Sequence, residues 1–116
     1  MPKPNVESGH KAVLASLLLN MPSVAEGKIF GYAAYYVSGK LFACIYGEGV
    51  GIKVPEEVAN KLLSEKQVVP FQPLGKPKMR EWIQINRARS ADCRKDINIF
   101  RTSVEFVSQI QATKRM

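Results

Sequence analysis

The residue types that most often carry chemistry are scarce and scattered in this sequence. His10 is the single histidine, and Cys44 and Cys93 stand far from it and from each other along the chain. A metal site usually needs three or four ligands, and a nucleophile needs a base positioned beside it. We therefore expect no metal, no cofactor and no catalytic residue, and we expect His10 to be a lone, exposed histidine. An enzyme would need a pocket that gathers residues such as Tyr36, Cys44 and Glu81.

Two local patterns resemble functional motifs but fit structural roles better. Glu56 and Glu57 follow Pro55, which suits the start of a helix. Neighbouring residues on a helix point about 100° apart, so these two carboxylates cannot converge on one substrate atom, and they suit the positive end of the helix dipole. The glycines of residues 47–51 form a GxGxG pattern, but a phosphate loop leads into a helix and a strand is expected here.

The charge of the chain is unevenly distributed. It has 116 residues with 17 Lys+Arg against 10 Asp+Glu, a net charge of +7. Residues 1–74 carry 7 basic and 6 acidic side chains, whereas residues 75–116 carry 10 and 4. Such asymmetry can mark a surface for nucleic acid, although no run of five or six basic residues occurs and the charge is also explained by solubility.

A nucleic-acid surface would draw on the second half of the chain. Trp82 would be its platform for stacking bases, unless it packs beneath a helix or a partner. The candidate residues for this surface are Lys76, Lys78, Arg80, Trp82, Arg87, Arg89, Arg94 and Lys95.

The first half of the chain predicts a helix followed by a three-stranded meander. Val6, Val13, Leu14, Leu17 and Leu18 lie near helical spacing, and residues 20–23 end that helix. Residues 28–37 predict a strand that is apolar on both faces, which indicates a covered strand or an interface. Residues 38–39 predict a two-residue hairpin turn, and residues 41–46 predict the strand that returns from it. Residues 47–49 predict a second turn, which leads into a third strand over residues 50–54 with one buried face.

The second half predicts a short helix, one long strand and a final helix. The helix begins at residue 55, with Val58, Leu62 and Leu63 facing inward. The prolines of residues 68–77 predict a loop, and residues 78–86 alternate as a strand with Trp82 on the face opposite to its apolar residues. A basic turn over residues 87–95 leads into an amphipathic helix from residue 97 to residue 110, and Ser90 or Asp92 is the expected cap of that helix. We expect one domain over residues 1–116, with frayed termini at residues 1–4 and 112–116.

This order predicts an α+β fold, a two-layer sandwich in which helices cover mostly one face of a twisted antiparallel sheet of four or five strands. Two segments then resemble the TfoX N-terminal domain family. They are GKIFGYAAYYVSGKLFACIYGEGVGIKVP, residues 27–55, and PFQPLGKPKMREWIQI, residues 70–85. The GKP segment with Glu81-Trp82 is the most specific element, and the YjbR-like proteins share the layout. The resemblance implies a stand-alone regulatory module of a bacterial family whose namesakes control natural competence, and it brings no catalytic residue.

The expected function is therefore non-catalytic binding through protein contacts, with a protein partner or a second copy of the chain. The interface candidates are Tyr32, Tyr35, Tyr36 and Tyr46. The alternative is the nucleic-acid module described above. No apolar stretch approaches the roughly 18 residues that span a bilayer, so we expect no membrane association. Two cysteines without a disulfide framework suggest a reducing, cytoplasmic location.

Overall fold

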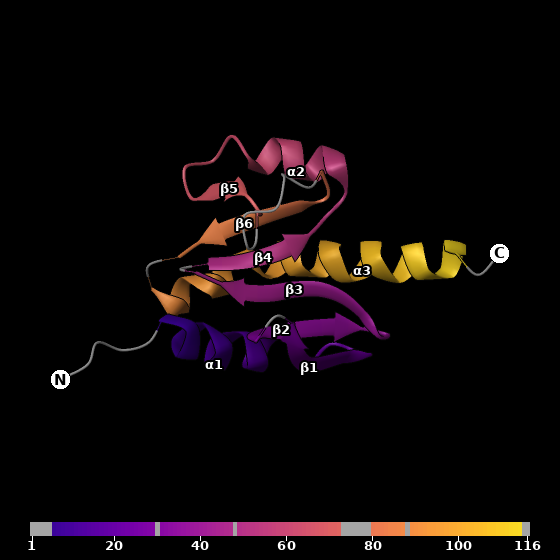
Figure 1. Ribbon diagram of the computed structural model, residues 1–116, viewed down its shortest axis with the longest axis horizontal. Helices are drawn as coiled ribbons and strands as arrows, with labels where there is room; N and C mark the ends of the chain where they lie inside the picture. Colours follow the sequence, from indigo (N-terminus) through magenta and orange to yellow (C-terminus); the bar gives the residue numbers. More distant parts are fainter. Residues whose placement is uncertain (1–5, 30, 48, 73–79, 88, 115–116) are drawn as a thin grey trace.

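An antiparallel sheet of six strands forms one layer of the molecule, and helices pack against one of its faces (Figure 1). The computed structural model describes residues 6–29, 31–47, 49–72, 80–87 and 89–114, with side chains described between residues 9 and 109. In chain order, the elements are α1 (Val6–Leu18), β1 (Val24–Ile29), β2 (Tyr32–Val37), β3 (Lys40–Tyr46), β4 (Gly49–Lys53), α2 (Glu56–Leu62), β5 (Val68–Pro70), β6 (Trp82–Asn86), the 3-10 helix η2 (Ser90–Asp96) and α3 (Ile97–Lys114).

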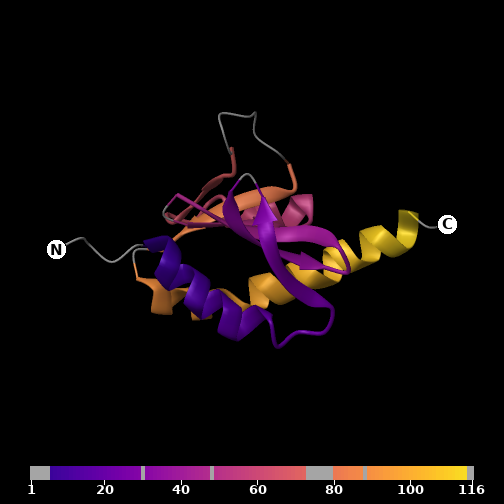
Figure 2. The same cartoon turned by 60° about the horizontal axis from the view of Figure 1, so that its bottom comes forward.

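The strands run in the order β1-β2-β3-β4-β6-β5, and every neighbouring pair is antiparallel. In Figure 2, α1 and α3 lie together on one side of the sheet. The α+β class with a two-layer arrangement is thus confirmed, although the sheet has six strands and not four or five.

The predicted three-stranded meander is a four-stranded one, because the strand expected over residues 28–37 is two strands. The chain turns between Ile29 and Tyr32, and Gly31 has a φ of 83°. That left-handed conformation is readily available to glycine and rarely to other residues. The pairing of Ile29 with Tyr32 closes this hairpin, so β1 becomes one edge of the sheet and β2 is covered on both sides by strands.

The other predicted turns and strands agree more closely with the structure. Ser38 and Gly39 form the turn between β2 and β3, with φ values of 51° and 83°. Such paired positive φ values match the right-handed twist of the flanking strands. Val50, Ile52 and Val54 are all buried on the helix-covered face, as their alternation predicts.

The proline-rich segment over residues 68–77 also differs from its predicted structure. Residues 68–70 are not loop but form β5, which pairs with β6 at the second edge of the sheet. An edge strand tolerates a proline because one side of it needs no hydrogen-bond donor. The strand β6 is shorter than the expected span over residues 78–86: Arg80 and Glu81 lie in a turn, and residues 73–79 are outside the described part of the chain.

The main core lies between the sheet and the helices. Leu14 and Leu18 from α1 and Phe100 and Val107 from α3 pack against the inward residues of β2, β3, β4 and β6. Ala59 of α2 belongs to the same core, so α2 covers this face at the β6 end. None of the helices in the described part of the chain is both long and apolar enough to cross a membrane.

His10 is buried and not exposed, which corrects the expectation from the sequence. Its side chain is 0% exposed, and its Nδ1 lies 2.8 Å from the Oγ of Ser90 in η2, while its Nε2 has no hydrogen-bond partner. The contact comes from the packing of η2 on α1, which places Ser90 directly against Gly9. Ser90 therefore holds the α1–η2 junction, and η2 has no side-chain cap at its start.

This junction predicts an unusual effect for Gly9→Ala. Alanine normally stabilises a helix by about 1 kcal/mol relative to glycine. Here a Cβ at position 9 would collide with the Oγ of Ser90. That hydroxyl can turn away only by losing its hydrogen bond with His10. Since an unpaired buried polar group costs about 1–3 kcal/mol, we expect a lower free energy of unfolding, measured by chemical denaturation.

The control is the same change in a Ser90→Ala background. With the hydroxyl gone, Gly9→Ala should become neutral or stabilising. An equal loss in both backgrounds would show that the hydroxyl contact does not determine the effect.

Candidate functional site

The face of the sheet opposite to the main core, called the second face from here on, carries most of the aromatic side chains of the strands. In β2, Ala33, Tyr35 and Val37 belong to the main core. Tyr32 and Tyr36 alternate with them and point to the other side, where a second cluster of buried residues forms around Ala34, Cys44 and Phe71.

Four rings form a continuous row across this face. They belong to Tyr32 of β2, Tyr46 of β3, Phe71 just after β5, and Trp82 of β6, and together they are called the aromatic row. Their centroids lie 5.0 Å apart for Tyr32–Tyr46, 5.7 Å for Tyr46–Phe71 and 5.3 Å for Phe71–Trp82. The first two contacts are edge-to-face, the geometry that the quadrupole of an aromatic ring favours.

Glycines beneath the rings let this row lie close to the sheet. A Cβ on Gly51 of β4 would lie 2.7 Å from the nearest atom of the Phe71 ring, so the ring occupies the space of a missing side chain. Tyr36 lies against Gly27 of β1 in the same way, and its hydroxyl donates a hydrogen bond to the backbone oxygen of Lys28 at 2.9 Å. The rings therefore cover the sheet closely, and the tyrosines and Trp82 remain half-buried.

Cys44 lies in the cluster beneath this layer and is only 4% exposed. Burial raises the pKa of its thiol to about 11, and a smaller opposing effect comes from a hydrogen bond with the backbone of Gly51. A thiol with a raised pKa is a poor nucleophile because it is almost fully protonated near neutral pH. Cys44 therefore acts as a small apolar residue of this cluster.

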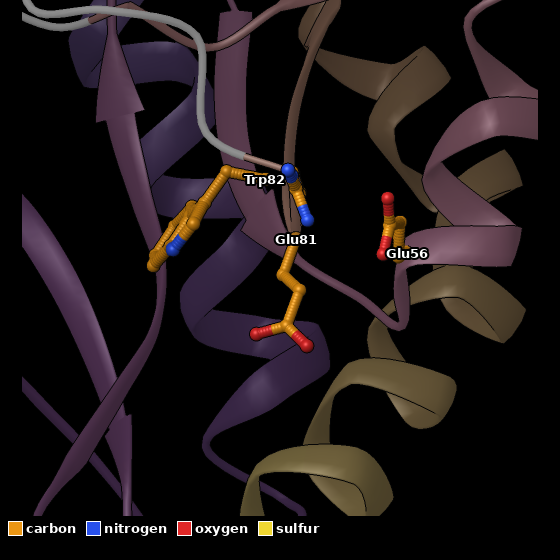
Figure 3. A pocket seen from close by; sticks show the side chains of 4 residues that line it. Glu56, Glu81 and Trp82 are labelled. Atoms are coloured by element: carbon orange, nitrogen blue, oxygen red, sulfur yellow. The ribbon is translucent and has the colours of Figure 1, made fainter.

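At the Trp82 end, the aromatic row borders a shallow hollow of about 480 Å³. It is lined by Glu56, Arg80, Glu81 and Trp82. Figure 3 shows Trp82 and Glu81 on one side of the hollow and Glu56, at the start of α2, on the other. Glu81 also lies 3.9 Å from the Nζ of Lys53, a distance that gives a weak, partly exposed ion pair.

The hollow brings charges of both signs together beside one aromatic ring. Two carboxylates and one guanidinium surround the indole, and neither Tyr36 nor Cys44 lines the space. Within the described residues, no group of three or more His, Cys, Asp or Glu side chains is placed to hold a metal ion. What these residues can do is bind, through the indole and through charges of both signs.

The structure brings three of the four candidate interface tyrosines to the second face. Tyr32, Tyr36 and Tyr46 lie there, half-buried. Tyr35 does not: it is 0% exposed in the main core, and its hydroxyl donates to the backbone oxygen of Lys11 at 3.4 Å. Burial, and then the charge of Glu26, raises the pKa of Tyr35 well above its ordinary value. Tyr35 is therefore a core residue and takes no part in the site described here.

The candidate residues for nucleic acid do not share one surface among the described positions. Arg80 and Trp82 lie at the start of β6, whereas Arg89, Arg94 and Lys95 are exposed on or beside η2, which follows the opposite end of that strand (Figure 1). Lys76 and Lys78 lie outside the described residues.

Arg87 has a structural partner. It donates two hydrogen bonds to the buried carboxylate of Asp96, at 3.1 and 2.6 Å. This hydrogen bonding raises the pKa of Arg87 above its ordinary value. Arg87 therefore joins the end of β6 to η2, and its guanidinium is committed inside the protein.

Sequence reasoning missed the central member of the row, Phe71. It stands among prolines in a segment that was expected to be loop, and its partner Gly51 was assigned to the third strand with no group expected to lie over it. The available signal was Gly51 itself, because a glycine in the interior of a strand often marks the close approach of another group.

Comparison with protein-family models, with curated proteins and with solved structures found no match to this chain.

The first prediction from this site concerns Gly51→Ala. The added methyl group would displace the Phe71 ring, which is held between Tyr46 and Trp82, and overpacking of this kind costs about 1–3 kcal/mol. The measurement is the free energy of unfolding, followed by the fluorescence of Trp82, the single tryptophan of the chain. In a Phe71→Ala background the same change should cost little, and an undiminished cost there would contradict the contact.

The second prediction concerns the reactivity of Cys44. Because its pKa is raised from 9.0 to about 11, its thiolate fraction at pH 8 falls by about a hundredfold, so alkylation should be slow and should accelerate with rising pH. Phe71→Ala should uncover Cys44 and speed its labelling, measured for each cysteine by mass spectrometry. Cys93, also buried and with a pKa raised by burial to about 11, is the internal control, and a parallel increase there would indicate general loosening.

Proposed function

We propose that this chain is a non-catalytic binding module, similar to the TfoX N-terminal domain, that recognises a protein partner through the second face of its sheet. The observation that carries the proposal is the aromatic row. It crosses four strands on the face that lies opposite to the main core, and its ring contacts keep its members in one layer.

The chemistry of this face suits a protein partner. Tyrosine and tryptophan dominate the centres of protein interfaces because they bury much apolar area with few rotatable bonds. Tyr32, Tyr46 and Trp82 are half-buried and held by neighbouring rings, so ordering them on binding costs little entropy. A regulatory role in a reducing, cytoplasmic compartment accords with two free, buried cysteines.

The nucleic-acid alternative has less support. It needs a stacking platform next to residues that contact phosphates. Trp82 is the platform, but Arg89, Arg94 and Lys95 lie at the other end of β6, and the hollow beside Trp82 contains two carboxylates. Its remaining support is the exposed basic side chains of η2, which could contact phosphates without any stacking.

Site-specific photo-crosslinking in the living cell tests the proposed function. A benzophenone amino acid replaces Tyr32 on the second face or, as the matched control, the exposed Arg101 of α3 on the helix side. We expect protein adducts from position 32 and few from position 101. Equal yields at both positions, or none at position 32, would contradict a binding function for this face.

A titration with single-stranded DNA tests the alternative. At low salt, we expect the fluorescence of Trp82 to stay unchanged, since two carboxylates line the hollow beside it and would repel phosphates. Quenching that disappears steeply with added salt would instead indicate phosphate contacts and base stacking at this residue.

A further inference from the structure

We propose that Tyr36 closes the β1 edge of the sheet, so that a strand from a second copy of this chain cannot pair with it. The device does not depend on the proposed function, because it concerns the edge of the sheet and not the row of rings across the second face. It is carried by the direction of the backbone groups of β1 and by one hydrogen bond from the Tyr36 hydroxyl.

The two edges of the sheet differ in length. Each edge of a sheet exposes backbone groups to which another strand can bind, and short strands and prolines are common means of blocking it. At one edge, β5 has only three residues, Val68–Pro70, and a proline has no N–H to donate. At the other edge, β1 has six residues, Val24–Ile29, and no proline. This longer edge needs a different protection.

The register of β1 and β2 determines which backbone groups of β1 face outward. Just before β1, the N–H of Ser38 donates to the backbone oxygen of Ser23 at 3.0 Å, in the same register as the paired positions 24 and 37. In antiparallel strands, hydrogen-bonded pairs alternate with pairs that are not bonded. Counting from Ser23, the odd-numbered residues of β1 bond to β2. The backbone groups of Glu26 and Lys28 therefore point away from β2, towards the free edge.

The hydroxyl of Tyr36 occupies one of these outward groups. It donates a hydrogen bond of 2.9 Å to the backbone oxygen of Lys28. Tyr36 belongs to β2, so its side chain crosses β1 to reach the edge. Gly27 permits this crossing, since a Cβ there would lie 3.0 Å from the nearest ring atom. A pairing strand would need the Lys28 oxygen as an acceptor, and the hydroxyl would first have to leave it.

Two charged side chains give this edge a second protection. Glu26 and Lys28 pair across the strands with Tyr35 and Ala33, so they lie on the face of the main core, and both are exposed. Charged residues that point inward from an edge strand hinder the addition of another strand. If two β1 strands paired in antiparallel fashion about Glu26, the two carboxylates would stand directly opposite one another, which is destabilising.

Removal of the hydroxyl tests the proposal. Tyr36→Phe keeps the ring over Gly27 but frees the Lys28 oxygen in both copies, so we expect self-association to strengthen about tenfold relative to the unsubstituted chain. Sedimentation velocity of the full chain at rising concentration measures this change. The matched control is Tyr32→Phe, which removes a hydroxyl from a ring that packs against Tyr46 on the β3 side. It should leave self-association nearly unaltered.

Amide hydrogen exchange shows where the copies associate. The N–H groups of Glu26 and Lys28 face outward, so in Tyr36→Phe they should exchange more slowly as the concentration rises. The N–H groups of Ala25 and Gly27 face β2 in the monomer and in the dimer, so their exchange should change little.

A second variant tests the role of charge at the edge. In the Tyr36→Phe background, Glu26→Gln removes the opposed carboxylates and should strengthen self-association further. Its control is Glu57→Gln, which changes the net charge by the same amount at an exposed position on α2, beside β6 and far from β1 (Figure 1).

Three outcomes would overturn the inference. They are equal self-association of Tyr36→Phe and Tyr32→Phe, stronger association that leaves exchange at Glu26 and Lys28 unchanged, and equal effects of Glu26→Gln and Glu57→Gln. None of these outcomes bears on the proposed function, which the adducts from position 32 test separately.

Discussion

The contact between the Phe71 ring and the backbone of Gly51 determines the character of the second face. A glycine in the interior of β4 leaves a gap in that face, and a ring from twenty residues later in the chain fills it. Tyr46 and Trp82 then pack on either side of this ring, and Cys44 is enclosed beneath it. One close approach of ring to backbone thus gives the sheet a second apolar layer that uses no helix.

The sequence was most informative where short-range chemistry determines the structure. The Ser38–Gly39 turn follows from the backbone freedom of glycine, and the burial of Val50, Ile52 and Val54 follows from the two-residue period of a strand. The same period placed Trp82 correctly on the face opposite to Ile83 and Ile85. Such features need no knowledge of distant segments, and they were enough to predict the α+β class.

One missed feature is local and two depend on contacts between distant segments. The turn at Gly31 is closed by the pairing of Ile29 with Tyr32, and it was missed because strand-forming side chains occur on both sides of it. His10 seemed exposed because nothing near it is apolar enough to bury it, and its partner Ser90 comes eighty residues later. Phe71 does lie outside the strands, as predicted, but its burial over Gly51 was missed because that residue stands twenty positions earlier. For His10 and Phe71, a tertiary contact that a window of ten residues does not contain decides the environment.

The same distinction applies to the charge of the chain. The composition singles out the second half of the chain as basic. In the folded protein, however, Arg87 forms an ion pair with Asp96, and Arg94 and Lys95 are exposed on η2. The aromatic row lies across the sheet instead. Within the described part of the chain, the exposed basic residues of η2 and the aromatic row lie on different elements, because the row is built from β2, β3, β6 and Phe71. The charge counted along the sequence therefore does not locate the aromatic surface, which is assembled only when the strands pair.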